Sequence, residues 1–154
     1  FMCAAAPLAR HMARAHQFLT FTTPPNLQVA VAFGLDTLGD WLAQMPVGLA
    51  ASQQRLAEAL AREGFAVLPS QGTYFLNLDL AASGVTLADH AFARLAVEQA
   101  GVATIPISAL YETDPVTTIL RLCFAKADAT LDEGAERLAR ARDLTAQAAG
   151  GRVI

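Results

Sequence analysis

One stretch near the end of the chain decides the fold, the alternating run Thr118-Ile119-Leu120-Arg121-Leu122-Cys123-Phe124. A period of two predicts a strand that has Leu120, Leu122 and Phe124 on one face and Arg121 on the other. A guanidinium cannot lose its charge, so at a half-buried position it needs an anion. Spacing alone leaves three environments open: Arg121 clamps a ligand carboxylate with its planar fork, pairs with a carboxylate such as Asp79, or lies in water on an edge strand.

The segments on either side of this run predict an α/β fold. Hydrophobic periodicity, glycines and prolines indicate helices over 8–19, 27–38, 46–63, 86–100 and 130–147. The last two are expected to open with the capping boxes Thr86–Asp89 and Thr130–Glu133. Strands are expected over 65–68, 73–78, 102–105 and 118–124. This order predicts helices packed on a small sheet.

The composition excludes several classes of protein. The 154 residues suffice for one domain with a core, and 54% hydrophobic with 16% charged residues excludes a disordered chain. A net charge of −3 argues against nucleic acid as a partner. The sequence has no uninterrupted run of about 18 apolar residues, so we expect no membrane span. Cys3 and Cys123 lack metal-ligand spacing, and His11 and His16 would not share one helix face, so we expect no metal site. Two cysteines that are expected to be free indicate a cytoplasmic protein.

A second candidate site lies where one strand is expected to begin, in Ser70-Gln71-Gly72-Thr73-Tyr74-Phe75. A glycine before a strand permits an unusual backbone angle or the close approach of a ligand. An ordinary turn accounts for the same composition. The sequence therefore predicts either a turn or a ligand-contacting loop at Gly72.

Four segments together resemble the class I/II pyridoxal-phosphate-dependent aminotransferases, in the kynurenine/methionine aminotransferase-like branch. They are residues 16–21, 71–76, 101–111 and 120–126, and they follow the family's order and spacing. The resemblance implies the small C-terminal domain of a fold-type I transferase, preceded by a long connecting helical segment. It assigns residues 1–45 to the end of a large-domain strand and the connecting helices, residues 46–148 to the small domain, and residues 149–154 to a frayed tail.

The same resemblance implies roles for five residues. Arg121 matches the arginine that holds the α-carboxylate of the amino-acid substrate, and Gly72 and Tyr74 match the loop beside the substrate side chain. Phe21 and Thr22 match a pair that reaches across a homodimer into the partner's active site. Relatives can have histidine where this chain has Thr22, so the substrate preference is not carried over.

The implied activity is the transfer of an amino group from an amino acid to a 2-oxo acid with pyridoxal 5′-phosphate. The family's cofactor-binding lysine lies upstream of the strand that would end at residues 1–6, whereas the only lysine here, Lys126, follows the R-x-C-F strand. We therefore expect a fragment of a longer enzyme, without catalytic or cofactor-binding residues and inactive alone. The alternatives are a fragment of a cysteine-conjugate β-lyase and a stand-alone, non-catalytic binding or dimerisation module.

Overall fold

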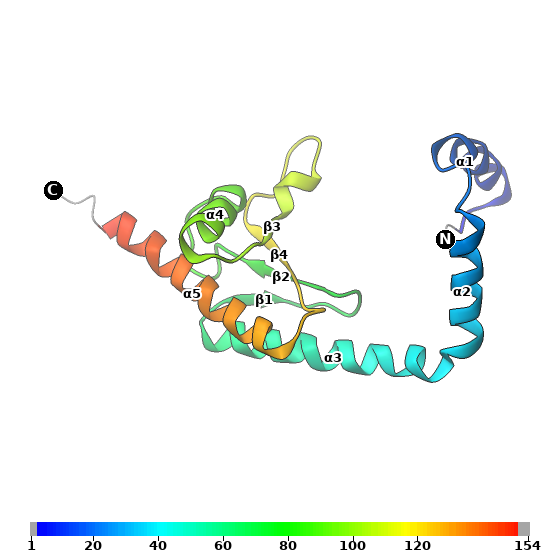
Figure 1. The fold of residues 1–154 in the computed structure, drawn as a ribbon. Coiled ribbons are helices and arrows are strands. Elements are labelled where there is room, and N and C mark those ends of the chain that lie inside the picture. Colours follow the sequence, from blue (N-terminus) through cyan, green and yellow to red (C-terminus); the bar gives the residue numbers. More distant parts are fainter. Residues whose placement is uncertain (1–2, 151–154) are drawn as a thin grey trace. The chain divides into compact units, whose positions relative to one another are not determined.

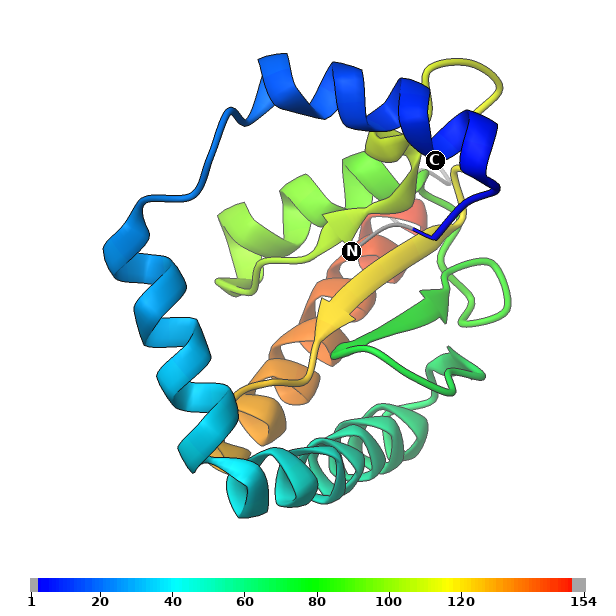
Figure 2. The ribbon, with the colours of Figure 1, turned by 90° about the vertical axis from the view of Figure 1, so that its right-hand side faces the viewer.

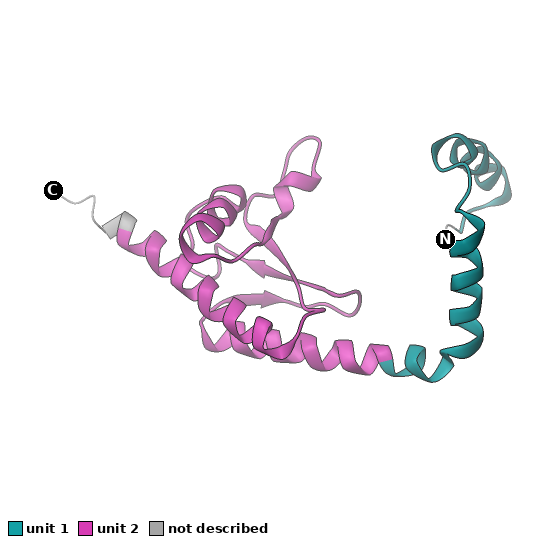
Figure 3. Ribbon diagram, viewed as in Figure 1, with its two compact units in different colours: residues 1–44 teal, residues 45–154 magenta. Residues whose placement is uncertain are grey.

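The computed structural model describes residues 3–150, the side chains of 148–150 excepted, and divides into two compact units (Figure 3). The first comprises residues 1–44 and the second residues 45–154. The expected strand over residues 1–6 is not formed at Cys3–Ala5, which have no regular structure, because no neighbouring strand supplies its backbone hydrogen bonds. Phe1, Met2 and the part of the expected tail at 151–154 lie outside the described residues.

The first unit contains α1 (Ala6–Leu19) and α2 (Pro25–Thr37). Each helix has a proline in its first turn, where the missing N–H has no intrahelical partner to lose. Neither helix has a buried residue, and Phe18 is 85% exposed. Their stability as helices therefore does not come from a core within this unit.

Helix α3 (Gly39–Arg62) is longer than the sequence predicts, because it continues through Pro46 instead of beginning there. A proline inside a helix loses one backbone hydrogen bond and crowds the preceding turn, which is why Pro46 indicated a helix start. The apolar stripe farther along the helix is as expected, with Leu56, Ala59 and Leu60 buried. Gly64, which takes a φ of +80°, follows the helix end.

Four strands form one antiparallel sheet in the order β1-β2-β4-β3 (Figure 1). They are β1 (Ala66–Leu68), β2 (Phe75–Asp79), β3 (Ile105–Pro106) and β4 (Ile119–Cys123). Strand β3 begins later than predicted and includes Pro106, which is tolerated because β3 is an edge strand. Strand β4 lies between β2 and β3, so it is an interior strand.

The helices of the second unit cover one face of this sheet. Helix α4 (Asp89–Leu95) continues into the π-helical turn Ala96–Ala100, and α5 (Asp128–Gly150) runs behind β4 in Figure 2. The core combines leucines of the strands with apolar residues of α3, α4 and α5, among them Leu60, Leu78, Phe92, Leu120 and Leu138. The predicted α/β fold, with helices packed on a small sheet, is confirmed.

Both predicted capping boxes are wrong. Helix α4 begins at Asp89, after the N-cap Ala88, and no side chain caps it. The Asp89 carboxylate is turned into the interior, where it accepts hydrogen bonds from Ser108. Helix α5 begins at Asp128, since the carbonyl of Ala127 already accepts the first backbone hydrogen bonds. The threonine of each box therefore lies outside the N-cap position.

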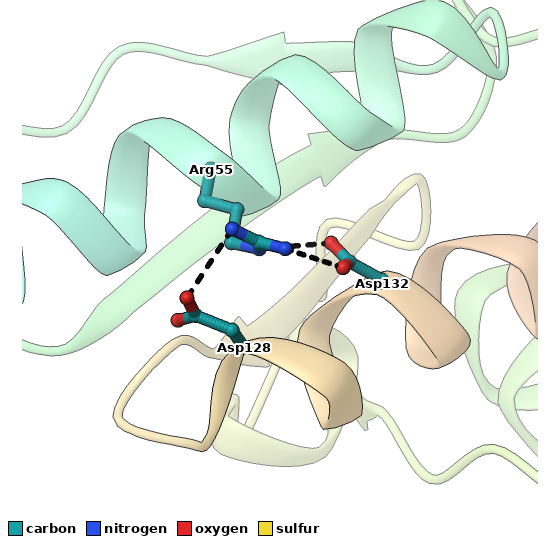
Figure 4. Close-up of polar contacts among 3 residues, drawn as sticks. All are labelled: Arg55, Asp128 and Asp132. Carbon is teal, nitrogen blue, oxygen red and sulfur yellow. Dashed lines mark hydrogen bonds and ion pairs between the residues drawn. The ribbon is translucent and has the colours of Figure 1, made fainter.

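An ion-pair cluster joins α3 to α5 (Figure 4). The Arg55 Nε and Nη2 groups donate to the two carboxylate oxygens of Asp132 at 3.0 and 2.6 Å, and Asp128 lies 3.2 Å from Nη1. The hydrogen bond from Arg55 lowers the pKa of Asp132. The three side chains are 43–67% exposed, so solvent screens the pair and its contribution to stability is small.

The Arg55→Gln variant is expected to raise the pKa of Asp132 toward its ordinary value, because the neutral amide no longer favours the carboxylate. A carboxyl with a depressed folded-state pKa stabilises the fold above its unfolded-state pKa and loses this contribution as the pH falls through the folded-state pKa. The measurement is an NMR titration of the Asp132 carboxyl carbon. The Arg62→Gln control should have a smaller effect, since Arg62 is the smallest cause of the shift; an equal effect would contradict this assignment.

Candidate functional site

Arg121 lies at the middle of the interior strand β4. Its backbone partners are Asn77 on β2 and Ile105 on β3. The predicted alternation is confirmed: Leu120 and Leu122 are buried against the helices, whereas Arg121 is half-buried on the opposite face. The strand thus holds a permanent cation on the face of the sheet that the helices of this unit leave uncovered.

The Arg121 guanidinium is held by an aromatic ring and not by an acid. Its Cζ lies 5.2 Å from the centroid of the Phe75 ring, and the Tyr74 ring lies 4.4 Å from that of Phe75. Within residues 3–147 no carboxylate oxygen lies within 4.0 Å of the Arg121 nitrogens. The ring stabilises the cation through its quadrupole and leaves the edge of the guanidinium open to an external anion.

Two of the three environments considered for Arg121 are wrong. Asp79 lies opposite Ile119, and its Oδ1 accepts the N–H of Ala82, so it does not pair with Arg121. The edge-strand environment fails because β4 has a neighbour on both sides. On this uncovered face, solvent or a ligand carboxylate can therefore lie beside the Arg121 guanidinium.

The loop before β2 differs in one respect from the expectation. The unusual backbone angle falls on Thr73, with a φ of +65°, and not on Gly72. The Thr73 hydroxyl accepts the N–H of Phe75 at 3.1 Å, which compensates part of this strain. A Cβ added to Gly72 would meet nothing within 4 Å, so the space beside Gly72 is open.

The Gly72→Ala variant is expected to leave the free energy of unfolding unchanged or to raise it by about 0.5 kcal/mol, because the methyl group meets no atom and the unfolded chain loses entropy. If the open space receives a substrate side chain, the same variant raises the KM for bulky amino acids in the complete enzyme. Urea denaturation measures the first effect and steady-state kinetics the second. A large loss of stability would show that Gly72 serves the turn itself.

The five residues implied by the resemblance fall in two units. Arg121 and Tyr74 lie in the second unit and meet through Phe75, with Gly72 two residues before Tyr74. Phe21 and Thr22 lie in the first unit, between α1 and α2. Phe21 is 84% exposed and takes a φ of +57°, which a bulky side chain rarely adopts.

Lys126 does not lie with Arg121. It lines a pocket of about 300 Å³ on the helix-covered side, together with Leu122, Leu131, Glu133 and Arg137, and Arg121 is absent from the lining. A pyridoxal-phosphate site needs a lysine that reaches the reacting carbon of the substrate. The described residues do not fit that requirement, because Arg121 is not among the residues that line the pocket of Lys126.

A buried carboxylate links the connections around β3 and β4. Asp89 is fully buried, and its oxygens accept from the Ser108 N–H at 2.8 Å, the Ser108 hydroxyl at 2.7 Å and the His90 N–H at 2.7 Å. The Asp89 N–H donates to the carbonyl of Thr117, just before β4. Asp89 thus fixes the turn after β3 and the approach to β4, the strand that carries Arg121.

Sequence reasoning missed the two residues of β2 nearest Arg121, which are Phe75 and Asn77. The alternation within 73–78 already places them on one face, but only the register shows that this face meets Arg121. Within residues 3–147, no three His, Cys, Asp or Glu side chains gather as a metal site would require. None of the helices described has the length and apolarity to cross a membrane.

Comparisons with known proteins give one consistent family. The family model "Aminotransferase class I and II" matches residues 1–138. The methionine aminotransferase of Escherichia coli is 35% identical over 90% of this chain and 36% of its own length. A probable N-succinyldiaminopimelate aminotransferase of Mycobacterium tuberculosis is 37% identical over 88% of this chain and 36% of its own length.

Solved structures agree with these matches. The N-succinyldiaminopimelate aminotransferase of M. tuberculosis superposes with a TM-score of 0.77 at 38% identity, over 90% of this chain and 36% of that one. The E. coli methionine aminotransferase superposes with a TM-score of 0.74 at 34% identity, over 89% of this chain and 36% of that one. The chain therefore spans about a third of the length of these similar proteins.

Proposed function

The chain belongs to the class I and II aminotransferases, and we propose that it supplies the part of a pyridoxal-phosphate-dependent aminotransferase that binds the substrate carboxylate. The predicted family is confirmed, and the architecture is that of fold-type I aminotransferases over about 36% of their length. The reaction of the complete enzyme is the transfer of an amino group from an amino acid to a 2-oxo acid.

The observation that carries this proposal is the guanidinium of Arg121, which lies on an interior strand and has no carboxylate partner within residues 3–147. Its fork donates two parallel hydrogen bonds, one to each oxygen of an α-carboxylate. Fixing the carboxylate limits rotation of the amino acid and thereby orients its Cα–H bond for proton removal. Pyridoxal phosphate, when bound, supplies the electron sink for this chemistry.

The cofactor itself is assigned to residues outside this chain. Lys126 lines a pocket whose lining does not include Arg121, so Lys126 is not proposed to hold the cofactor. Phe21 and Thr22 are proposed to contact the substrate of a partner subunit in a homodimer, which agrees with the high exposure of Phe21. A cytoplasmic location is part of the proposal, supported by the free thiols of Cys3 and Cys123.

The test is an amino-transfer assay of the complete enzyme that carries this chain. Methionine, kynurenine and N-succinyldiaminopimelate, on which the similar proteins are named to act, are offered with a 2-oxo acid and added pyridoxal phosphate. We expect the 2-oxo acid to be converted to its amino acid with at least one donor. Cofactor binding without amino transfer from any donor would contradict the proposal, and release of pyruvate from a cysteine conjugate alone would indicate a β-lyase.

A further inference from the structure

Asn77 occupies an unexpected position for an asparagine, the middle of the interior strand β2. Asparagine is depleted in strands because its short polar side chain competes for backbone hydrogen bonds. Both flanking residues, Leu76 and Leu78, are buried on the core face, so Asn77 lies on the same face as Arg121. The two residues are directly opposite each other in the β2–β4 register.

The side chain of Asn77 has an unmet need for a donor. Its Oδ1 is shielded from solvent and has no hydrogen-bond partner among the described residues. An acceptor withdrawn from water without a partner is destabilising, so such groups in folded proteins call for a specific explanation. On this face of the sheet, the residue directly across from Asn77 is the one richest in donors, with five N–H groups.

The position of the Arg121 guanidinium indicates which of its donors could bond to Asn77 Oδ1. Its Cζ lies over Phe75, which pairs with Cys123, so the Arg121 side chain leans diagonally from its position opposite Asn77 toward the next pair along the strands. Residues directly opposite in a sheet have Cβ atoms about 4.5–5.5 Å apart. The Arg121 stem therefore passes beside Asn77, and Nε–H, at the root of the fork, is the one of the five donors that is attached directly to that stem.

We propose that Asn77 positions Arg121 by accepting its Nε–H through Oδ1 when a carboxylate substrate binds. This leaves the two terminal Nη groups, facing away from the strand, to hold the carboxylate end-on. Phe75 limits the tilt of the guanidinium plane, and Asn77 limits its rotation about the long axis of the side chain. The inference rests on the proposed role of Arg121 and adds a residue that acts through it.

The decisive variant is Asn77→Leu in the complete enzyme, because leucine keeps the volume and removes the acceptor. The KM for the amino acid is expected to rise about tenfold, as for the loss of one hydrogen bond to a charged group, with the larger part of the effect in KM and not in kcat. The thermal midpoint should stay level or rise, since an unsatisfied buried oxygen is removed. The Asn77→Asp variant should raise KM further, because an internal carboxylate competes for the guanidinium.

The chain offers a matched control in Thr104. Its Oγ1 is the other buried side-chain oxygen without a partner among the described residues. Thr104 directly precedes Ile105, the β3 partner of Arg121, so alternation directs it to the opposite face of the sheet. The Thr104→Val variant should affect the thermal midpoint as Asn77→Leu does and leave KM unchanged.

The outcomes separate this inference from the proposed function. If Arg121→Met raises KM while Asn77→Leu leaves it within twofold, the role of Asn77 is overturned and that of Arg121 stands. If Arg121→Met itself leaves KM unchanged, both fail. A third outcome would show that Asn77 has only a structural role and that the inference is wrong. In it, Asn77→Leu lowers the thermal midpoint, and Thr104→Val raises KM as much as Asn77→Leu raises it.

Discussion

Replacing Arg121 with methionine in the complete enzyme is expected to raise the KM for the amino-acid substrate by about a hundredfold, because each hydrogen bond to a charged group contributes about 1.5–3 kcal/mol. Methionine preserves much of the stem that lies against Phe75 but has no donor for a carboxylate. The KM of the Arg121→Lys variant should fall between those of the starting enzyme and Arg121→Met, since lysine keeps the charge and loses the planar fork. Steady-state kinetics at saturating 2-oxo acid measures the effect.

The control for this variant is the absorbance of the bound cofactor, which should be unchanged because the cofactor is proposed to bind residues outside this chain, whereas Arg121 is proposed to bind the substrate carboxylate. An altered cofactor spectrum would mean that Arg121 acts on the cofactor site and not on the substrate. A KM within twofold of the starting enzyme would contradict the carboxylate-binding role.

The second large effect is expected at Asp89. The Asp89→Ala variant should lower the free energy of unfolding by about 3–4 kcal/mol, because three hydrogen-bond donors lose one fully buried acceptor together. The segment that loses its anchor is the turn at Ser108, whereas the backbone N–H of residue 89 still donates to the carbonyl of Thr117 before β4. Chemical denaturation of the chain, monitored by circular dichroism, measures the change.

Ser108→Ala provides the scale for this prediction. It removes one hydroxyl donor and keeps the backbone N–H bond to Asp89, so we expect a loss of about 1 kcal/mol. A loss at Asp89→Ala no larger than that at Ser108→Ala would show that water replaces the carboxylate, and the anchoring role of Asp89 would then be wrong.

Part of the fold follows from local patterns. The alternation at 118–124 predicted both faces of β4, because its leucines and its arginine differ maximally in their cost of burial. The order of helices and strands was predictable for the same reason. The continuation of α3 through Pro46 was not, since the local cost of a proline in a helix says nothing of how the rest of that helix is stabilised. The first capping box failed because tertiary contacts of Asp89 took precedence over a local cap, and the second failed because α5 begins at Asp128, before the predicted cap.

The candidate site was predictable only in part. A lone arginine in an apolar strand is visible in the sequence, and the resemblance gave it a role. Phe75 and Asn77 became candidates only through the pairing of β2 with β4, whose paired residues are 40 to 48 positions apart in the sequence. The positive φ expected at Gly72 occurs at Thr73 instead, where a side-chain hydrogen bond compensates part of the strain.

The most direct test of the account is a crystal structure of the complete enzyme with an amino-acid substrate analogue bound. We expect both oxygens of its α-carboxylate within about 3 Å of the Arg121 guanidinium nitrogens, the distance of a charge-assisted hydrogen bond. An analogue whose carboxylate binds elsewhere, with Arg121 paired to a carboxylate of the protein, would contradict the central claim.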